Sequence, residues 1–451
     1  MAEFLTSTDE FMWSLGEDPV LRSTIVSLMI LERAPEWDLV VERFERLTRV
    51  APRFRQVVSP TVPPLPARWE EHAEFDLDWH LHRVSAPQPR TFPVLVNLAE
   101  VAMMTDLDRT RPLWEVTLVE GMADGSAALL CKFDHALTDG VGAVALAAAL
   151  YDELEVLAAS EGSKRPSGSV AAQVLETIRH PLTTAATAFD TAVSIYRAAR
   201  PIAGPLSPVM RRRSATRRLE ILEVSRSGLR RAGDAAGGTV NDAFLAAVTG
   251  GLRRYHDHHG VTVDQLMTSM PISVRGPHDG IGGNRATLVR FDVPVGEVDP
   301  MRRIREIHAR TMAARGEKAL AYTQLIAKAL NVMPRGYVGS ELRHVDFIAS
   351  DVPGSPVPLK MGGAPIRSQY AFSPTLGAAV NTTLLSYVDV CAIGVNIDAG
   401  AIPDHDVLRD CLTAGFEETL SVHAAGGGPN PTTGGARPRR PHCAPRRPRR
   451  G

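Results

Sequence analysis

The stretch KFDHALTDGVG, from Lys132 to Gly142, decides how the rest of the chain is interpreted. The residues before it, 127–133 (AALLCKF), form a short apolar run that is typical of a buried strand. Residues 139–154 begin with an almost entirely apolar half and predict a buried helix. His135 therefore stands where a buried strand meets a buried helix, a junction that holds a side chain in one direction.

A histidine in this position suits acid–base chemistry. A neutral imidazole can take a proton from an alcohol near pH 7, because its unperturbed pKa is about 6.5. Asp139, four residues further on, can hold the loop by accepting hydrogen bonds, and Gly140 permits a close approach of the backbone. The same spacing is equally compatible with a core histidine followed by an ordinary helix N-cap at Asp139, so spacing alone leaves both interpretations open.

The rest of the chain predicts two mixed α/β halves. Strand signals at 112–120 and 127–133 flank a turn at Ala123-Asp124-Gly125. In the second half, a helix begins after Thr239 and ends at Gly260. We expect four segments: an N-terminal domain at 1–158, a crossover with amphipathic helices at 159–218, a C-terminal domain at 219–424 and a disordered basic tail at 425–451.

The composition is that of an ordinary globular protein of 451 residues, with 44% hydrophobic and 22% charged residues. Seven arginines lie after residue 436 with no acidic residue among them. Without them, 43 basic residues face 51 acidic ones, so the body of the chain is mildly acidic. An acidic body disfavours nucleic-acid binding.

Export and membrane insertion are not predicted. The N-terminus lacks a basic region followed by an apolar one, and the longest apolar stretch, 141–151, is shorter than the ~20 residues that a bilayer span needs. The 4 cysteines form no CxxC pair, which indicates reduced thiols. His256-Asp257-His258-His259 lies at a helix end, where we expect a solvated turn and no metal. We expect a cytoplasmic protein.

Lys132–Gly142 resembles the HHxxxDG motif of the CoA-dependent acyltransferase superfamily. Further stretches resemble one branch of it, the bacterial wax ester synthase/diacylglycerol acyltransferase family, in order and spacing over roughly residues 5–422. These stretches are Asp108–Glu115 (DRTRPLWE), Thr239–Asp242 (TVND), Met270–Arg275 (MPISVR), Gly283-Asn284, Ser350–Gly354 (SDVPG) and Ser386-Tyr387. The resemblance implies two chloramphenicol-acetyltransferase-like domains of mixed sheets and helices, with a tunnel between them.

The resemblance also implies roles for individual residues. His135 matches the catalytic histidine, which would deprotonate an alcohol that then attacks the thioester of acyl-CoA. Asp139 matches the structural aspartate, and Arg275 is the candidate for its arginine partner. Acyl-CoA is then a co-substrate, and thioester-to-ester exchange needs neither a metal nor another cofactor.

The sequence departs from the family pattern at Asp134, which occupies the place of the first histidine. Neighbouring residues at a strand end point to opposite sides, so we expect Asp134 to be structural and to act on His135 through its charge. Asn241 and Asp242 open a helix, and Thr239 with Asp242 resembles a capping box, so capping is favoured over substrate contact. Trp114 is expected in the core.

The leading hypothesis is an acyltransferase that converts diacylglycerol or a long-chain alcohol to triacylglycerol or wax ester. Two alternatives remain: a related enzyme with another alcohol acceptor, or a non-catalytic acyl- or lipid-binding homologue. Such substrates imply contact with a membrane or lipid-droplet surface. Residues 170–200 and the clusters Arg211–Arg213 and Arg217-Arg218 are the candidates for that contact.

Overall fold

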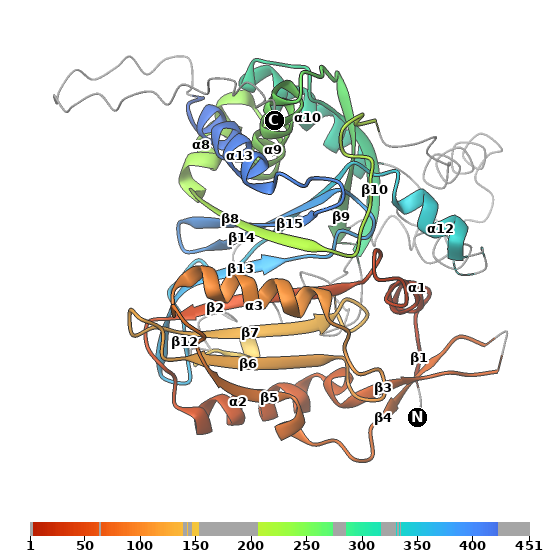
Figure 1. Cartoon of the computed structure of the whole chain (residues 1–451), viewed down its shortest axis with the longest axis vertical. Coiled ribbons are helices and arrows are strands. Elements are labelled where there is room, and N and C mark those ends of the chain that lie inside the picture. Colours follow the sequence, from red (N-terminus) through yellow and green to blue (C-terminus); the bar gives the residue numbers. More distant parts are fainter. Residues whose placement is uncertain are drawn as a thin grey trace, which may run out of the picture.

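The computed structural model describes residues 3–62, 65–138, 142, 147–152, 206–273, 286–316, 331, 333 and 335–422. Two six-stranded sheets, each carrying helices, lie one above the other (Figure 1). The predicted mixed α/β class with two sheet-rich domains is confirmed. The predicted tail at 425–451 and the crossover as far as residue 205 lie outside the described residues.

The N-terminal sheet has the strand order β12-β13-β2-β7-β6-β5. Its pairs are antiparallel except for β5 with β6. Helix α2 (Trp37–Val50) packs on one face through Phe44 and Leu47, and α3 (Phe92–Met104) packs on the other. The strands are β2 (Thr24–Leu31), β5 (Leu81–Ser85), β6 (Trp114–Glu120), β7 (Ala127–Asp134), β12 (Lys360–Met361) and β13 (Ala364–Phe372).

The hairpin of β6 and β7 confirms the two strands predicted around the Ala123-Asp124-Gly125 turn. Gly125 has a φ of 78°, a conformation that a residue without a Cβ adopts readily. Asp124 accepts hydrogen bonds from the backbone and hydroxyl of Ser126, which closes the turn. This local chemistry fixes the register of β7, the strand that ends immediately before His135.

The C-terminal sheet has the strand order β10-β9-β11-β14-β15-β8. Strand β11 runs parallel to both of its neighbours, whereas the other pairs are antiparallel. The strands are β8 (Arg217–Ser225), β9 (Gln265–Ser273), β10 (Ala286–Pro294), β11 (Phe347–Val352), β14 (Val380–Tyr387) and β15 (Val390–Asp398). Four helices pack on one face: α8 (Arg226–Ala236), α9 (Val240–His258), α10 (Pro300–Arg315) and α13 (His405–Leu420).

A small third sheet lies at the side of the N-terminal half, with the order β1-β4-β3. It consists of β1 (Glu3–Phe4), β3 (Gln56–Ser59) and β4 (Arg68–Glu71). Helix α1 (Ser7–Leu15) follows β1, and α12 (Arg335–Leu342) lies near it on the same side of the molecule (Figure 1). The Asn331 side chain, shortly before α12, donates a hydrogen bond to the Ser7 carbonyl oxygen, so this part of the C-terminal half contacts the N-terminal half.

The C-terminal half contributes two strands to the N-terminal sheet. β13 pairs antiparallel with β2, with Tyr370 opposite Leu28, and β12 extends this edge. Assigning all of 219–424 to one domain did not anticipate this exchange. The alternating pattern of β13 specifies a strand, but it carries no information about which strand will be its partner.

The return from β13 to β14 brings the two sheets into close contact. A Cβ at Gly394 in β15 would lie 2.1 Å from the Ala371 carbonyl oxygen of β13, so a larger residue would push the sheets apart. Asn381 and Asn396 donate to the carbonyl oxygens of Pro374 and Ser373 in the connecting segment. The two halves therefore meet through packed backbone and buried amides.

A buried ion pair fixes the start of β8. Arg217 lies 3.1 Å from Asp398, and their side chains are 6% and 0% exposed. The guanidinium also donates to the Val20 carbonyl oxygen of the N-terminal half. Asp398 accepts from the backbone of Ser214, so one carboxylate holds both the incoming chain and β8.

The arginine clusters predicted to contact lipid have mostly structural roles. Arg213 donates to the carbonyl oxygens of Met210, Arg343 and Gly377, and Arg217 is buried against Asp398. Arg211 and Arg212 are exposed. Only part of each predicted cluster is therefore available for lipid contact, because a run of charges in a sequence does not show which of them are paired inside the fold, and the contact itself stays a prediction.

Replacing Arg217 by methionine should leave the Asp398 carboxylate buried without its cation. We expect a loss of about 3–5 kcal/mol in the free energy of unfolding, measured by urea denaturation. The matched control is Arg367→Met, which removes an exposed pair with Asp124 and should cost less than about 1 kcal/mol. Equally small losses in the free energy of unfolding of the two variants would show that the buried pair stabilises the fold no more than the exposed pair does.

Candidate functional site

His135 lies in the turn that follows β7, and its side chain is half-buried. Its backbone N–H donates to the Ser23 carbonyl oxygen at 3.0 Å, and the Leu137 N–H donates to the Asp134 carbonyl oxygen at 3.1 Å. The turn is therefore held from both sides, by β7 and by the residue before β2. This arrangement gives His135 the fixed backbone position that the sequence predicts for a strand end.

The Asp134 side chain is buried, with 7% of the residue exposed. One carboxylate oxygen accepts from the Ser23 hydroxyl at 2.9 Å and the other from the Ala136 N–H at 2.8 Å. Burial raises the pKa of Asp134, while these hydrogen bonds and the charges of His135 and Arg109 act to lower it. The carboxyl group thus closes the turn that carries His135, at an electrostatic cost that burial imposes.

Arg109, from the DRTRPLWE stretch, connects this turn to helix α1. Its guanidinium donates to the Trp13 carbonyl oxygen at 2.9 Å and lies over the Trp13 ring at 5.0 Å. It also lies 3.4 Å from Glu17. The roles of Ser23 and Arg109 were not predicted. The only signal for Arg109 was its membership of a motif ahead of His135, and nothing in the sequence marked Ser23.

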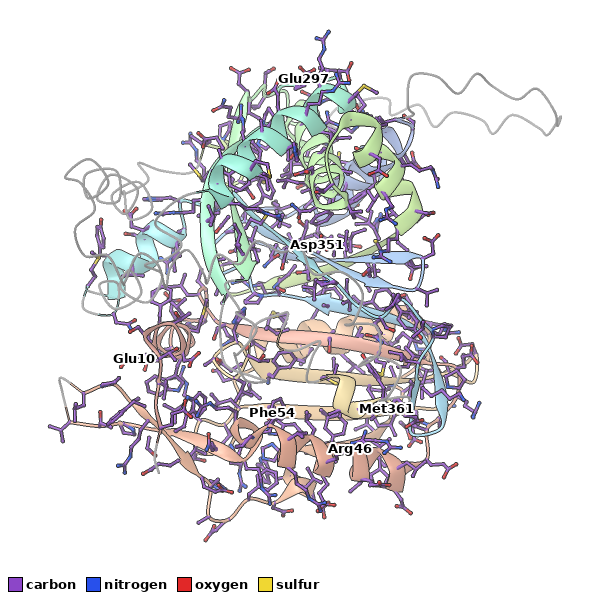
Figure 2. All side chains as sticks on the ribbon, turned by 180° about the vertical axis from the view of Figure 1, so that it is seen from behind. Glu10, Arg46, Phe54, Glu297, Asp351 and Met361 are labelled. Atoms are coloured by element: carbon purple, nitrogen blue, oxygen red, sulfur yellow. The ribbon has the colours of Figure 1, made fainter. Side chains whose placement is uncertain are left out.

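Trp114 is a core residue, as predicted, with 1% exposed. Its indole N–H donates to the Phe54 carbonyl oxygen, and its ring stacks on His80 with centroids 4.4 Å apart. Phe54 lies low in the N-terminal half, among the elements beneath its sheet (Figure 2). Burial lowers the pKa of His80, so this imidazole is a neutral packing partner.

The second predicted pair cannot be placed. Asp139, Gly140 and Arg275 lie outside the described residues, as do Gly283 and Asn284. The pairing of Asp139 with Arg275 and the role of Gly140 therefore remain predictions. Gly142, at the end of the quoted stretch, is described and is buried in a helical conformation.

Asp242 closes the N-terminus of α9 with the predicted capping box. The Thr239 hydroxyl accepts from the Asp242 N–H, and the Asp242 carboxylate accepts from the Thr239 N–H at 2.9 Å. The same carboxylate lies 2.8 Å from His308 Nδ1 of α10. Asn241 Nδ2 lies 3.6 Å from the Met270 sulfur of β9, so TVND and the first residue of MPISVR, distant in sequence, are neighbours in space.

SDVPG and Ser386-Tyr387 meet where the chain leaves the C-terminal sheet after β11 on its way to β12. The Ser386 hydroxyl accepts from the Gly354 N–H at 3.1 Å. The Tyr387 hydroxyl accepts from the Leu359 N–H and donates to the Ile366 carbonyl oxygen. These motif residues therefore support the exchanged strands.

The run His256–His259 is exposed at its last three residues, as the predicted solvated turn requires, and departs from the prediction only at His256. His256 is fully buried and bridges the Leu252 carbonyl oxygen and the Ser207 hydroxyl. Burial lowers the pKa of His256, which favours a neutral core imidazole. Within the described residues, no group of three or more histidine, cysteine or acidic side chains could hold a metal ion.

Two family models match the chain. The wax ester synthase/diacylglycerol acyltransferase catalytic domain matches residues 5–244, and the corresponding C-terminal domain matches residues 282–419. The chain belongs to the wax ester synthase/diacylglycerol acyltransferase family. It is accordingly an acyltransferase of the acyl-CoA-dependent diacylglycerol acyltransferase or wax synthase type.

Named relatives agree with this membership. A putative diacylglycerol O-acyltransferase of Mycobacterium tuberculosis is 36% identical over 94% of this chain and 92% of its own length. A probable diacylglycerol O-acyltransferase of the same species is 28% identical over 92% and 95%.

Solved structures share the fold. The wax ester synthase/diacylglycerol acyltransferase of Marinobacter aquaeolei has a TM-score of 0.65 at 22% identity, over 92% of this chain and 98% of that one. A starter condensation domain of rhizomide synthetase, in complex with C8-CoA and Leu-SNAC, has a TM-score of 0.62 at 15% identity, over 93% of each chain. Among the described residues of the present family member, no helix is both long and apolar enough to cross a bilayer.

The raised pKa of Asp134 predicts how stability responds to pH. The folded protein binds this proton more tightly than the unfolded chain, so the contribution is fully present below about pH 3.9 and is lost as pH rises through the folded pKa. Asp134→Asn should therefore gain stability relative to wild type as pH rises above about 4, measured by urea denaturation across pH.

Asp124→Asn supplies a control with the opposite sign. Hydrogen bonds from Ser126 lower the pKa of Asp124 to about 2. The stability of wild type should therefore increase relative to that of this variant as pH rises from about 2 to 4. If Asp134→Asn shows the same trend as Asp124→Asn, burial does not dominate at Asp134.

Proposed function

We propose that this family member transfers the acyl group of acyl-CoA to the hydroxyl of diacylglycerol or a long-chain alcohol, with His135 as the general base. The observation that carries the proposal is the position of His135, in a hydrogen-bonded turn at the end of β7 and at the histidine of the family motif. Its acyl-CoA donor and alcohol acceptor are inferred from the family and from the names of the relatives.

The chemistry proceeds by proton transfer and direct attack. The imidazole of His135 takes the proton of the acceptor hydroxyl as its oxygen forms a bond to the thioester carbonyl carbon. The tetrahedral intermediate then collapses, the carbon–sulfur bond breaks, and the imidazolium returns the proton to the leaving thiolate. The products are an ester and free CoA, with no acyl-enzyme and no cofactor beyond the acyl-CoA co-substrate.

Asp134 supports the base by two means in this proposal. Its hydrogen bonds to Ser23 and Ala136 hold the turn, and its negative charge stabilises the imidazolium that forms during attack. Both effects are available without the first histidine of the family motif. Asp134 can therefore hold the turn in an enzyme that catalyses the reaction. Its presence in place of the first histidine does not require a purely non-catalytic binding protein, which disfavours that alternative.

Long-chain acceptors partition into lipid, so we also propose peripheral contact with a membrane or lipid-droplet surface. An acceptor screen with mass-spectrometric detection of products and of released CoA separates the remaining alternatives. Palmitoyl-CoA is offered with diacylglycerol, hexadecanol or a glycolipid alcohol. Esterification of the glycolipid alone would favour the related enzyme with another acceptor, and binding without CoA release from any of them would favour the non-catalytic homologue.

His135→Ala should lower turnover by roughly 100- to 10,000-fold, because one positioned acid–base group contributes about that much. The variant should remain folded and still bind acyl-CoA. His405→Ala is the control: His405 contacts Glu220 at the surface of the C-terminal half, and its loss should leave turnover within about twofold. Wild-type turnover in His135→Ala would refute the assignment of the base.

Asp134→Asn should move the acid limb of the pH–rate profile to lower pH, because the negative charge that stabilises the His135 imidazolium is removed. Asp134→His restores the family pattern and should give equal or higher turnover. An unshifted acid limb in Asp134→Asn would mean that the Asp134 charge does not act on the base.

A further inference from the structure

The described residues in the tip of the β3–β4 hairpin (residues 60–66), Val62 and Leu65 among them, present apolar side chains to solvent. Val62 is 79% exposed, the highest value among the large hydrophobic side chains of the described residues, and Leu65 is 57% exposed. Phe4, on the neighbouring strand β1, is 48% exposed. Apolar surface gathered on one projecting element marks an interaction site more often than scattered exposure does.

The base of this hairpin is firmly held. Val58, Ala67 and Trp69 are each less than a tenth exposed, and Trp69 is 1% exposed. The Arg53 guanidinium lies 4.6 Å from the centre of the Trp69 ring, and β1 pairs with β4 on the outer side. The exposed tip is therefore carried by an anchored support.

The backbone of the tip carries few hydrogen-bond donors. Four of its seven residues are prolines, which lack an N–H. The Leu65 N–H donates to the Val62 carbonyl oxygen, and the Thr61 hydroxyl lies 2.7 Å from the carbonyl oxygens of both Leu65 and Pro66. The missing N–H groups and these internal hydrogen bonds lower the cost of moving the segment out of water, because an unpaired polar group is expensive in an apolar phase.

The charges around the tip also favour a lipid surface. No acidic residue occurs from Gln56 to Trp69, and Arg68 at the base has 44% of its side chain exposed. The nearest acidic residue along β4, Glu70, is paired with Arg68 and hydrogen-bonded to Ser59. No negative charge from residues 56–69 would therefore face an anionic or zwitterionic headgroup layer, and the exposed Glu71 lies at the end of β4 away from the tip.

The hairpin projects from the side of the molecule toward which β7 runs before His135 (Figure 1). Helix α12 lies on the same side, with Tyr337 42% exposed, and Met333 just before it is 39% exposed. A projecting tip offers no groove for a small ligand. Its shape suits insertion into a lipid layer, on the side of the protein that carries His135, the proposed general base.

We propose that Val62 and Leu65 insert into a lipid surface and orient this side of the protein toward it. The inference rests on the proposed function, since a lipid acceptor is what makes such an orientation useful. In this proposal the main contact with lipid is apolar and made by Val62 and Leu65, and the arginine clusters are not the main contact. Binding should therefore depend weakly on salt.

The test is flotation of the full chain with neutral phosphatidylcholine vesicles at low and high salt. We expect wild type to float in both conditions, and the double variant Val62→Asp/Leu65→Asp to partition at least about tenfold more weakly, since two apolar side chains are replaced by charges. Val298→Asp is the matched control. Val298 is 61% exposed and follows Glu297, which Figure 2 labels at the far end of the C-terminal half, so this variant should float like wild type.

A second measurement reports insertion directly. Tryptophan introduced as Val62→Trp should be quenched by vesicles of brominated phosphatidylcholine, and tryptophan introduced as Val298→Trp should not. His135→Ala should float as wild type does, so failure of the catalytic proposal is separable from failure of this one. Vesicle binding that is equal in wild type and the double variant, or absent in wild type, would overturn the proposal.

A protein partner is the other possible occupant. If the double variant changes the sedimentation of the protein from a dimer to a monomer in the absence of lipid, the tip is an interface between two copies and the lipid proposal is wrong.

Discussion

The buried carboxyl group of Asp134 is the constraint on which the arrangement of the site depends. It joins two separate pieces of chain: the end of β7 with the turn that carries His135, through the Ala136 N–H, and Ser23 before β2. Arg109 brings helix α1 into the same neighbourhood. A carboxyl group can accept from two directions at once, so the position can be structural and electrostatic together, whereas an apolar residue there would leave the Ser23 hydroxyl and the Ala136 N–H without this acceptor.

The two halves are not independent domains, because strands from the C-terminal half form part of the N-terminal sheet. The N-terminal sheet is complete only when β13 has paired with β2, and Gly394 allows β15 of the C-terminal sheet to approach β13 closely. The Tyr387 hydroxyl bonds to the backbone of Leu359, just before β12, and of Ile366, within β13. Ser386 and Tyr387, which carry part of the family resemblance, therefore have observed contacts that hold the connection between the two sheets.

Features that local chemistry determines could be predicted from the sequence. The β6–β7 hairpin follows from two apolar runs around Asp124-Gly125, and the N-terminus of α9 follows from the spacing of Thr239 and Asp242. Features that depend on distant partners could not. The pairing of β13 with β2, the burial of Arg217 against Asp398, and the hydrogen bond from Ser23 to Asp134 each join residues that no local pattern connects. The burial of His256 was missed for the same reason, because its partner Ser207 comes from the crossover.

The strand exchange also determines how long β2 stays without its partner strand during synthesis of the chain. Arg33, just after β2, bonds to Gly363, just before β13, across 330 residues of chain. A ribosome adds about 5–20 residues per second, so the β2 edge waits roughly 15–60 s for its neighbour. β2 is almost entirely apolar, and an uncovered edge of that kind readily pairs with other chains. The nascent protein is therefore most prone to aggregate on the ribosome, and chaperone supply or slower initiation should govern its yield more than the stability of the finished fold does.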